Sequence, residues 1–301
     1  MGGRHYRRIT GLAVAGVMAA GTAAGLAAAP AAPALASTGS ASTSSASTSS
    51  ARTDVASKQI CVSKAHPKLA ARLSRRITGA VRGRQGDIGL AAADAKLGLT
   101  CSLNASAHFY AASVIKATII SALLLKEGGV GHLSARQHTL AWEMITESDN
   151  DAATALWNQV GISGMQHFLD RAKMTHTELS DAWGLTLITA SDEVTLLKLL
   201  TSRGRVLSTP SRRYALYLMA HVEAGQRWGV PAGAPSKVTV HVKNGWLPYP
   251  VQWNINSIGA FTGPGITYQI AMLTSDNPSM SYGIATIQGA CKFLNWNLAA
   301  F

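Results

Sequence analysis

Two groups of strand-like segments lie at opposite ends of the chain, and this arrangement limits the possible folds more than any other feature. Near the N-terminal end, GDIGLAAADAKLGLTCSLNA at 86–105 reads as two strands joined at Lys96-Leu97-Gly98. After Pro235, three further β runs follow, separated by turns: KVTVHVKNG, QWNINSIGAFTG and ITYQIAMLT. We expect the two groups to meet in one antiparallel sheet, with the segment between them folded as an insertion.

The segments around and between the strands have apolar residues at helical spacing. One such pattern lies at 66–84, and another, SYGIATIQGACKFLNWNLAA, closes the chain. The middle of the chain contains five more patterns, at 113–128, 137–147, 150–160, 191–202 and 210–222. These patterns predict an α+β fold in which the terminal helices back the antiparallel sheet and an all-helical lobe at about 113–235 packs against it. A cleft between two such lobes is a common place for a ligand.

The first 36 residues have the features of a secretory signal peptide. MGGRHYRR is a basic start, an Ala- and Gly-rich apolar run follows, and Ala34-Leu35-Ala36 is a small-residue exit. A membrane anchor is the alternative, and the weak hydrophobicity of the run argues against it. Arg7-Arg8 suits the twin-arginine export route without requiring it. We expect cleavage after Ala36 and a secreted, extracellular protein of the cell envelope, without a stable membrane anchor.

Residues 37–58 are almost entirely Ser, Thr and Ala. This composition offers too little apolar area to offset the entropy of ordering, so it predicts a disordered linker. A single folded domain is therefore expected over 59–301.

The formal charge of the chain is +12, of which Arg4, Arg7 and Arg8 contribute three. The other cations lie in short runs on helical patterns, which favours solvated helix faces over a nucleic-acid site. A mild attraction to anionic cell-wall polymers follows from the charge alone. We expect a protein that binds no nucleic acid and is a monomer.

Three cysteines in an oxidising compartment suggest one disulfide and one thiol. Cys61 precedes the first helix and Cys101 begins a strand, which favours the pair Cys61–Cys101. Cys291 lies in the apolar C-terminal helix and is expected to be a core thiol. The sequence has no C-x-x-C, no H-E-x-x-H and no tight cluster of His and Cys, so no metal or cofactor is expected.

Ser113 and Lys116 form an S-x-x-K at the start of a hydrophobic helix, one turn apart and on the same face. Backbone N–H groups at a helix start can stabilise an oxyanion, and a lysine in an apolar setting loses proton affinity and can act as a base. A helix cap at Ser113 with a snorkelling Lys116 explains the same residues, and the pattern alone does not exclude it.

Two later motifs make a chemical role more specific. Ser148 and Asn150, in Ser-Asp-Asn, lie at a break between two helical runs, where a hydroxyl can relay a proton and an amide can bind substrate. Lys243-Asn244-Gly245 ends a β run, where a glycine lets a substrate lie along the strand and the N–H of Trp246 can point into the cleft. A second Ser-Asp-Asn at 275–277 precedes Pro278 and reads as a strand-to-helix turn.

These three motifs resemble those of the penicillin-recognising serine hydrolases, in particular class A β-lactamases, with their S-x-x-K, S-D-N and K-T-G. The likeness extends over essentially the whole folded domain. The order of strands and helices also resembles the two-lobed β-lactamase/transpeptidase-like fold of that family.

The resemblance implies an acyl-serine mechanism. Ser113 would attack a β-lactam carbonyl or a peptide, with Lys116 assisting its deprotonation. Ser148, paired with Lys243, would pass a proton to the departing nitrogen. The N–H groups of Ser113 and Trp246 would hold the oxyanion.

The resemblance also implies substrate contacts. Asn150 would bind the side-chain amide of the substrate, and Lys243 would favour its acidic end. Asn244 and Gly245 complete the third motif as substrate-binding positions. The implied substrate is a β-lactam or a cell-wall fragment.

The sequence departs from the class A pattern in three places. The Glu-x-x-Leu-Asn whose glutamate activates the deacylating water is missing, and the loop that would carry it is shortened. Glu178 or Asp181 could substitute, although a solvated carboxylate or a helix cap explains either residue. Asn244 replaces the usual Thr or Ser, and the spacing from Ser113 to Ser148 is short.

We therefore predict a serine hydrolase that acylates but deacylates slowly. β-Lactam hydrolysis is the expected activity. A D,D-peptidase or esterase acting on another acyl substrate is the alternative within the superfamily. A pseudoenzyme that binds penicillin or cell wall without turnover is the alternative from another class, because the deacylating glutamate is missing.

Overall fold

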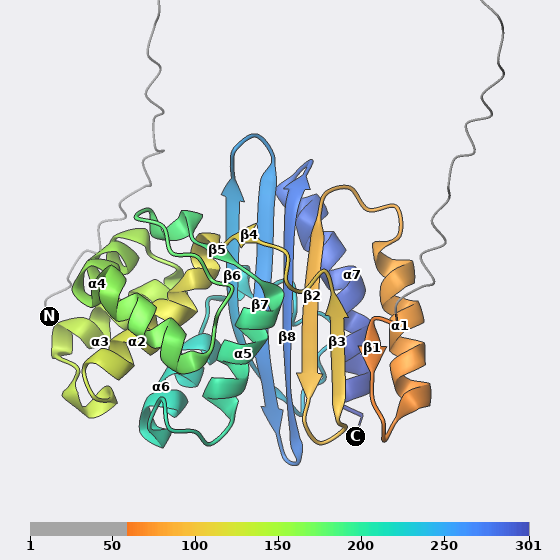
Figure 1. The fold of residues 1–301 in the computed structure, drawn as a ribbon, viewed down its shortest axis with the longest axis horizontal. Helices are drawn as coiled ribbons and strands as arrows, with labels where there is room; N and C mark the ends of the chain where they lie inside the picture. Colours follow the sequence, from red (N-terminus) through yellow and green to blue (C-terminus); the bar gives the residue numbers. More distant parts are fainter. Residues whose placement is uncertain (1–58, 301) are drawn as a thin grey trace, which may run out of the picture. The chain divides into compact units, whose positions relative to one another are not determined.

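Strands from both ends of the chain form one antiparallel sheet in the computed structural model, which describes residues 59–300. The strand order is β1-β3-β2-β8-β7-β6, and β2 pairs with β8 through partners such as Leu90 and Met272 (Figure 1). The strands are β1 (Cys61–Val62), β2 (Ile88–Asp94), β3 (Leu99–Leu103), β6 (Thr239–Pro248), β7 (Trp253–Gly263) and β8 (Ile266–Asn277). The predicted signal peptide and linker lie outside the described residues.

Helices cover both faces of this sheet. α1 (Pro67–Val81) and α7 (Met280–Leu298) pack together, and α7 lies on β7 and β8. α5 (Ala190–Thr201) lies against β2, β7 and β8 on the opposite face (Figure 1). The central strand β2 is consequently buried at all its positions. The predicted α+β class is confirmed, but a helix from the middle of the chain, and not only the terminal helices, covers the sheet.

The other helices gather beside β6 and around α2 (Lys116–Lys126). Nine of its residues are buried, as expected for a helix that is apolar on all sides. α2 packs against α4 (Asn150–Ala172) and α6 (Thr209–Ala220), and α3 (Ala135–Trp142) packs on α4. No helix within residues 59–300 is long and apolar enough to cross a membrane.

Short elements connect the helices, and the sequence patterns did not reveal them. They are η1 (Ala112–Ile115), η2 (Val130–His132), η3 (Glu143–Glu147), η4 (Trp183–Leu185), η5 (Ala224–Gln226), and the paired strands β4 (Phe109–Tyr110) and β5 (Leu187–Ile188). Elements of two to five residues are too short to show a period. The pattern at 150–160 also ended too early, because the chain turns at Gly161, where φ is 73°, and then continues helically to Ala172.

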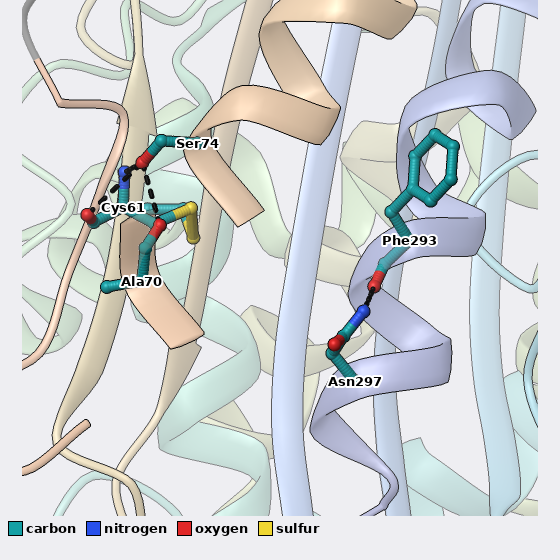
Figure 2. Close-up of a disulfide and its surroundings, with 6 residues drawn as sticks. Cys61, Ala70, Ser74, Phe293 and Asn297 are labelled. Carbon is teal, nitrogen blue, oxygen red and sulfur yellow. Dashed lines mark hydrogen bonds between the residues drawn. A yellow bond between two sulfur atoms is a disulfide. The ribbon is translucent and has the colours of Figure 1, made fainter. Parts of the chain in front are cut away.

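A disulfide joins Cys61 on β1 to Cys101 on β3, the pair favoured by the sequence. Ser74 of α1 accepts a hydrogen bond from the backbone N–H of Cys61 at 2.8 Å, so the helix is fixed to the bridged strands (Figure 2). Cys291 is a free, fully buried thiol 3.9 Å from the sulfur of Met272. Cys291 is therefore a core residue, as expected from the sequence, and its burial raises the pKa of its thiol.

Candidate active site

Ser113 lies in η1, immediately before α2 begins at Lys116. Its hydroxyl has no hydrogen-bond partner among residues 59–300 and is partly exposed. The preceding residue, Ala112, has φ of 47°, a left-handed conformation that costs a non-glycine residue about 1–2 kcal/mol. A strained backbone conformation persists only where the surrounding structure stabilises it, and such conformations are common at functional sites. The strain falls next to the predicted nucleophile.

Gly245 on β6 lies directly against the backbone of η1. A Cβ at this position would lie 2.9 Å from the N atoms of both Ser113 and Val114 and from the O atom of Ala111. Only glycine allows the strand to approach so closely. The sequence linked this glycine to a substrate lying along the strand. The structure gives it another role, in which its missing side chain brings the edge strand of the sheet to Ser113.

Lys116 is fully buried, and its Nζ atom contacts the first Ser-Asp-Asn. Nζ donates to the carbonyl of Ser148 at 2.7 Å, to Oδ1 of Asn150 at 2.8 Å and to Oγ of Ser148 at 3.3 Å. Burial lowers the pKa of Lys116 to about 7, and the carboxylate of Asp149 partly opposes this shift. A lysine in this condition exists in both protonation states near neutral pH.

Lys243 reaches Ser148 from the sheet. Its Nζ atom lies 2.9 Å from Ser148 Oγ and 3.2 Å from the carbonyl O of Asn244. Burial, followed by the charge of Lys116, lowers the pKa of Lys243 well below its ordinary value. Lys243 lies within β6 and not at its end, because the strand continues to Pro248.

The position of Ser148 depends on the turn between α3 and α4. η3 is a π-helical turn, and Ser148 follows it with φ of 60° and ψ of 32°. Asp149 then caps α4 by accepting from the N–H of Ala152 at 2.7 Å. This combination turns the Ser148 hydroxyl toward the two lysines and places Asn150 in the first turn of α4. Irregular turns of this kind are frequent at functional sites.

The amide of Asn244 does not take the substrate-facing role suggested by its motif. Its Nδ2 atom donates to the backbone carbonyls of Gln226 and Trp228, at 2.6 and 2.9 Å. The residue is fully buried, and its Oδ1 atom has no partner in the described part of the chain. Asn244 therefore fastens the loop after η5 to β6. The sequence could not reveal this role, because the hydrogen bonds between the loop and the strand form only in the tertiary structure.

The two carboxylates considered for deacylation form no ion pair or hydrogen bond with Lys116 or Lys243 in the described part of the chain. The carboxylate of Glu178 is 64% exposed and 3.5 Å from Nε2 of His108. Asp181 is exposed and forms no hydrogen bond or ion pair within residues 59–300. Neither side chain has a hydrogen bond to Ser113 or Ser148 within residues 59–300.

Trp183, which the sequence did not single out, occupies the space beside Lys116. The centroid of its ring lies 4.9 Å from Lys116 Nζ, and its Nε1 atom donates to Thr154 at 3.2 Å. η4, which carries this tryptophan, packs against η1. The shortened loop therefore places an aromatic ring, and not a carboxylate, at the lysine.

Aromatic side chains also surround the outer part of β6. The ring of Trp246 is partly buried and 6.0 Å from that of Trp228. Tyr249, in the turn after β6, packs edge-on against Tyr110 of β4 at 5.1 Å. No group of three or more potential His, Cys, Asp or Glu metal ligands occurs within 59–300.

The second Ser-Asp-Asn has a structural role. Asn277 is buried at the end of β8, and its Nδ2 atom donates to the carbonyl of Trp253 at 2.8 Å. Asp276 has φ of 52°, so the chain turns there toward α7. This copy forms no hydrogen bond or ion pair with Lys116, Ser148 or Lys243 within the described residues.

Comparison with known proteins concerns the family and the fold. A family model described as the beta-lactamase enzyme family matches residues 125–292, which include Ser148 and Lys243 and begin after Lys116. No curated protein matches the chain.

Solved structures of low sequence identity share the fold. A β-lactamase from Sphaerobacter thermophilus matches with a TM-score of 0.66 and 18% identity, over 76% of this chain and 97% of its own. A class A β-lactamase from Bacteroides cellulosilyticus matches with a TM-score of 0.64 and 17% identity, over 76% and 98%. PBP-A matches with a TM-score of 0.66 and 20% identity, over 76% and 97%.

Proposed function

The chain belongs to the beta-lactamase enzyme family, and from this we propose that it is a serine hydrolase that opens a β-lactam amide through an acyl-enzyme on Ser113. The observation that carries the proposal is the pair of buried lysines, Lys116 and Lys243, whose Nζ atoms both lie within 3.3 Å of Ser148 Oγ. Two desolvated amines on one hydroxyl, together with a Ser113 hydroxyl that has no hydrogen-bond partner within residues 59–300, support a proton-transfer system over a helix cap.

Acylation begins with the neutral form of Lys116. Because its pKa is about 7, an unprotonated amine is available near neutral pH to take the proton of Ser113. Ser113 Oγ then bonds to the carbonyl carbon of the substrate. The N–H of Ser113 and that of Trp246 are proposed to hold the resulting oxyanion.

Ser148 delivers the proton that completes the step. Its oxygen can accept from both lysines through its two lone pairs, which leaves its own O–H to donate. When the carbon–nitrogen bond of the amide breaks, this proton passes to the nitrogen, and one of the two lysines returns a proton to Ser148. The Nδ2 of Asn150 has no partner within 59–300 and is available to bind the side-chain amide of the substrate.

Slow deacylation is supported by the Trp183 ring that lies beside Lys116. A general base must come within hydrogen-bond reach of the attacking water. Trp183 lies over the amine, while the carboxylate of Glu178 lies at His108. We propose that the acyl-enzyme persists because water near Lys116 is restricted and no carboxylate activates it.

One experiment tests the proposal. The purified domain is mixed with a chromogenic cephalosporin, and colour release and intact mass are followed together. A burst of one equivalent, an adduct on Ser113 and slow turnover are expected. Ser113→Ala should give no adduct with an unchanged fold, and labelling of that variant would disprove the role of Ser113.

The same measurement separates the other candidate functions. A stable adduct without turnover favours a D,D-peptidase or esterase, which should then cleave an acyl-D-Ala-D-Ala peptide or an ester. The absence of any adduct at high concentration would leave a binding pseudoenzyme. We also propose export through residues 1–36, which N-terminal sequencing of protein from the culture medium would test by a start at Ser37.

A further inference from the structure

Five cations gather on the surface formed by α1 and α7. Four exposed side chains, those of Lys68, Arg72, Arg75 and Arg76, lie on α1, and the partly buried Lys292 lies on α7. We call this surface the basic face. Figure 1 shows α1 beside the β1 edge of the sheet with α7 packed against it, whereas Ser113 lies against β6 at the other edge. The basic face is therefore separate from the proposed active site.

The charges of the basic face have no counter-charge within the described residues. Neither α1 nor α7 contains an aspartate or a glutamate. Arg72, Arg75, Arg76 and Lys292 form no salt bridge within residues 59–300. Arg72 donates instead to the neutral amide of Asn297, at 2.8 Å. A cluster of cations without neighbouring anions creates a positive potential that attracts a polyanion.

Aromatic rings lie among these cations. Arg76 lies 5.5 Å from the centroid of the Phe293 ring, and Lys292 lies 5.2 and 5.9 Å from those of Phe293 and Trp296. Phe293 and Asn297 are neighbours on α7, beside α1 (Figure 2). Trp296 is 58% exposed, and it is the only large apolar side chain of α1 or α7 that is mostly exposed. One exposed ring is too little apolar surface for insertion into a membrane.

A hollow of about 360 Å³ opens between the two helices. Its lining includes Arg75, Arg76, Lys292 and Phe293, with Gly79 and Gly289 where side chains would otherwise project. A Cβ at either glycine would meet no atom within 4 Å, so the space is open. Three cations and an aromatic ring around a hollow of this size fit one anionic group and its neighbouring carbon atoms.

The cations extend from the hollow along α1. Lys68, Arg72 and Arg76 follow one another at intervals of four residues, which corresponds to steps of about 6 Å on one helix face. A row of cations at regular steps suits a chain of repeated charges better than a single small anion. We propose that the basic face binds a linear phosphodiester polymer, with one phosphate in the hollow and successive phosphates along α1. Binding there would hold the enzyme on an anionic polymer while leaving Ser113 accessible.

The test uses the described domain and poly(glycerol phosphate) of defined length, titrated at several NaCl concentrations. The first variant is Arg75→Gln/Arg76→Gln/Lys292→Gln. Its matched control, Arg136→Gln/Arg203→Gln/Arg205→Gln, removes the same charge from exposed positions elsewhere. We expect the first variant to lose at least tenfold in affinity and the control to lose less than threefold. The dependence of log K on log salt should become shallower by about 2 in the first variant.

A second variant, Gly289→Leu, fills the hollow without changing the charge and is expected to weaken binding severalfold. Equal losses in the two triple variants would show general charge attraction and disprove a site. Unchanged affinity in Gly289→Leu would disprove the role of the hollow. Tighter binding to phosphatidylglycerol vesicles, or to a single-stranded oligonucleotide, than to poly(glycerol phosphate) would overturn the assignment of the polymer. Chromogenic turnover should be unchanged in all variants, so this test is independent of the acyl-serine proposal.

Discussion

Lys116 and Lys243 reach the same oxygen from two different parts of the fold. The Nζ of Lys116, at the start of α2, is 3.3 Å from Ser148 Oγ, and the Nζ of Lys243, within β6, is 2.9 Å from it. Burial lowers the pKa of both amines, and the charge of Lys116 lowers the pKa of Lys243 further.

The rate of acylation should depend on pH through Lys116. Since its pKa is about 7, the rate should rise about tenfold per pH unit below 7 and level off above it. Asp149→Asn removes the carboxylate that raises this pKa and keeps a side chain able to cap α4, so the midpoint should move to lower pH. The measurement is the rate of adduct formation from pH 5 to 9. A midpoint that moves upward would contradict the role of Asp149.

Trp183→Ala should shorten the life of the acyl-enzyme. Removing the ring over Lys116 lets water reach the amine, so deacylation should accelerate about tenfold or more while the adduct still forms. The better-hydrated lysine should also have a higher pKa, so acylation should need higher pH. Trp142→Ala, at a tryptophan that is 38% exposed, is the control and should leave the lifetime unchanged. An unchanged adduct lifetime in Trp183→Ala would show that this ring does not restrict water.

Gly245→Ala should separate β6 from η1. The added Cβ would lie 2.9 Å from the N atom of Ser113, so the strand or the turn must move. A displacement of this kind should reduce acylation by about 100-fold and cost about 1–3 kcal/mol of unfolding free energy. Gly131→Ala, where a Cβ meets nothing within 4 Å, is the matched control. Adduct formation at the parent rate in Gly245→Ala would rule out the close contact.

Glu193 should make the protein less stable as pH rises. Its carboxyl is fully buried on α5 without a hydrogen-bond partner among the described residues, and burial, followed by the charge of Asp192, raises its pKa well above the ordinary value. A raised folded-state pKa contributes stability that is complete below the unfolded pKa of about 4.3 and is lost as pH rises through the folded value.

Glu193→Gln removes this loss. The variant and the parent should have similar unfolding free energies at pH 4. Above pH 4, the unfolding free energy of the variant should exceed that of the parent by about 1 kcal/mol more for each pH unit, up to the folded pKa of Glu193. Urea unfolding at pH 4, 6 and 8 measures the difference. The exposed Glu223→Gln is the control and should show no such trend. A constant difference between parent and Glu193→Gln at all three pH values would refute the buried neutral carboxyl.

The sequence predicted the fold well where a period was long enough to read. The two strand groups, the terminal helices and the helix that follows Ser113 could be predicted from alternation or from helical spacing within one segment. Two-residue strands and the 3₁₀ and π turns were missed as separate elements, because they are too short for a pattern to repeat. α5 was placed as a helix but not on the sheet, since its apolar residues do not identify the surface that they cover.

The candidate site divides in the same way. The sequence alone determined that Ser113 and Lys116 share a face, because residues three apart in a helix do so in any fold. Only the tertiary structure decided that Lys243 meets Lys116 at Ser148, that Gly245 touches the backbone of Ser113, and that Asn244 fastens a loop. It also placed the Trp183 ring 4.9 Å from Lys116 Nζ and the Glu178 carboxylate at His108. The physical reason is that spacing within one element orients its side chains, whereas contacts between elements up to about 130 residues apart depend on how their surfaces pack.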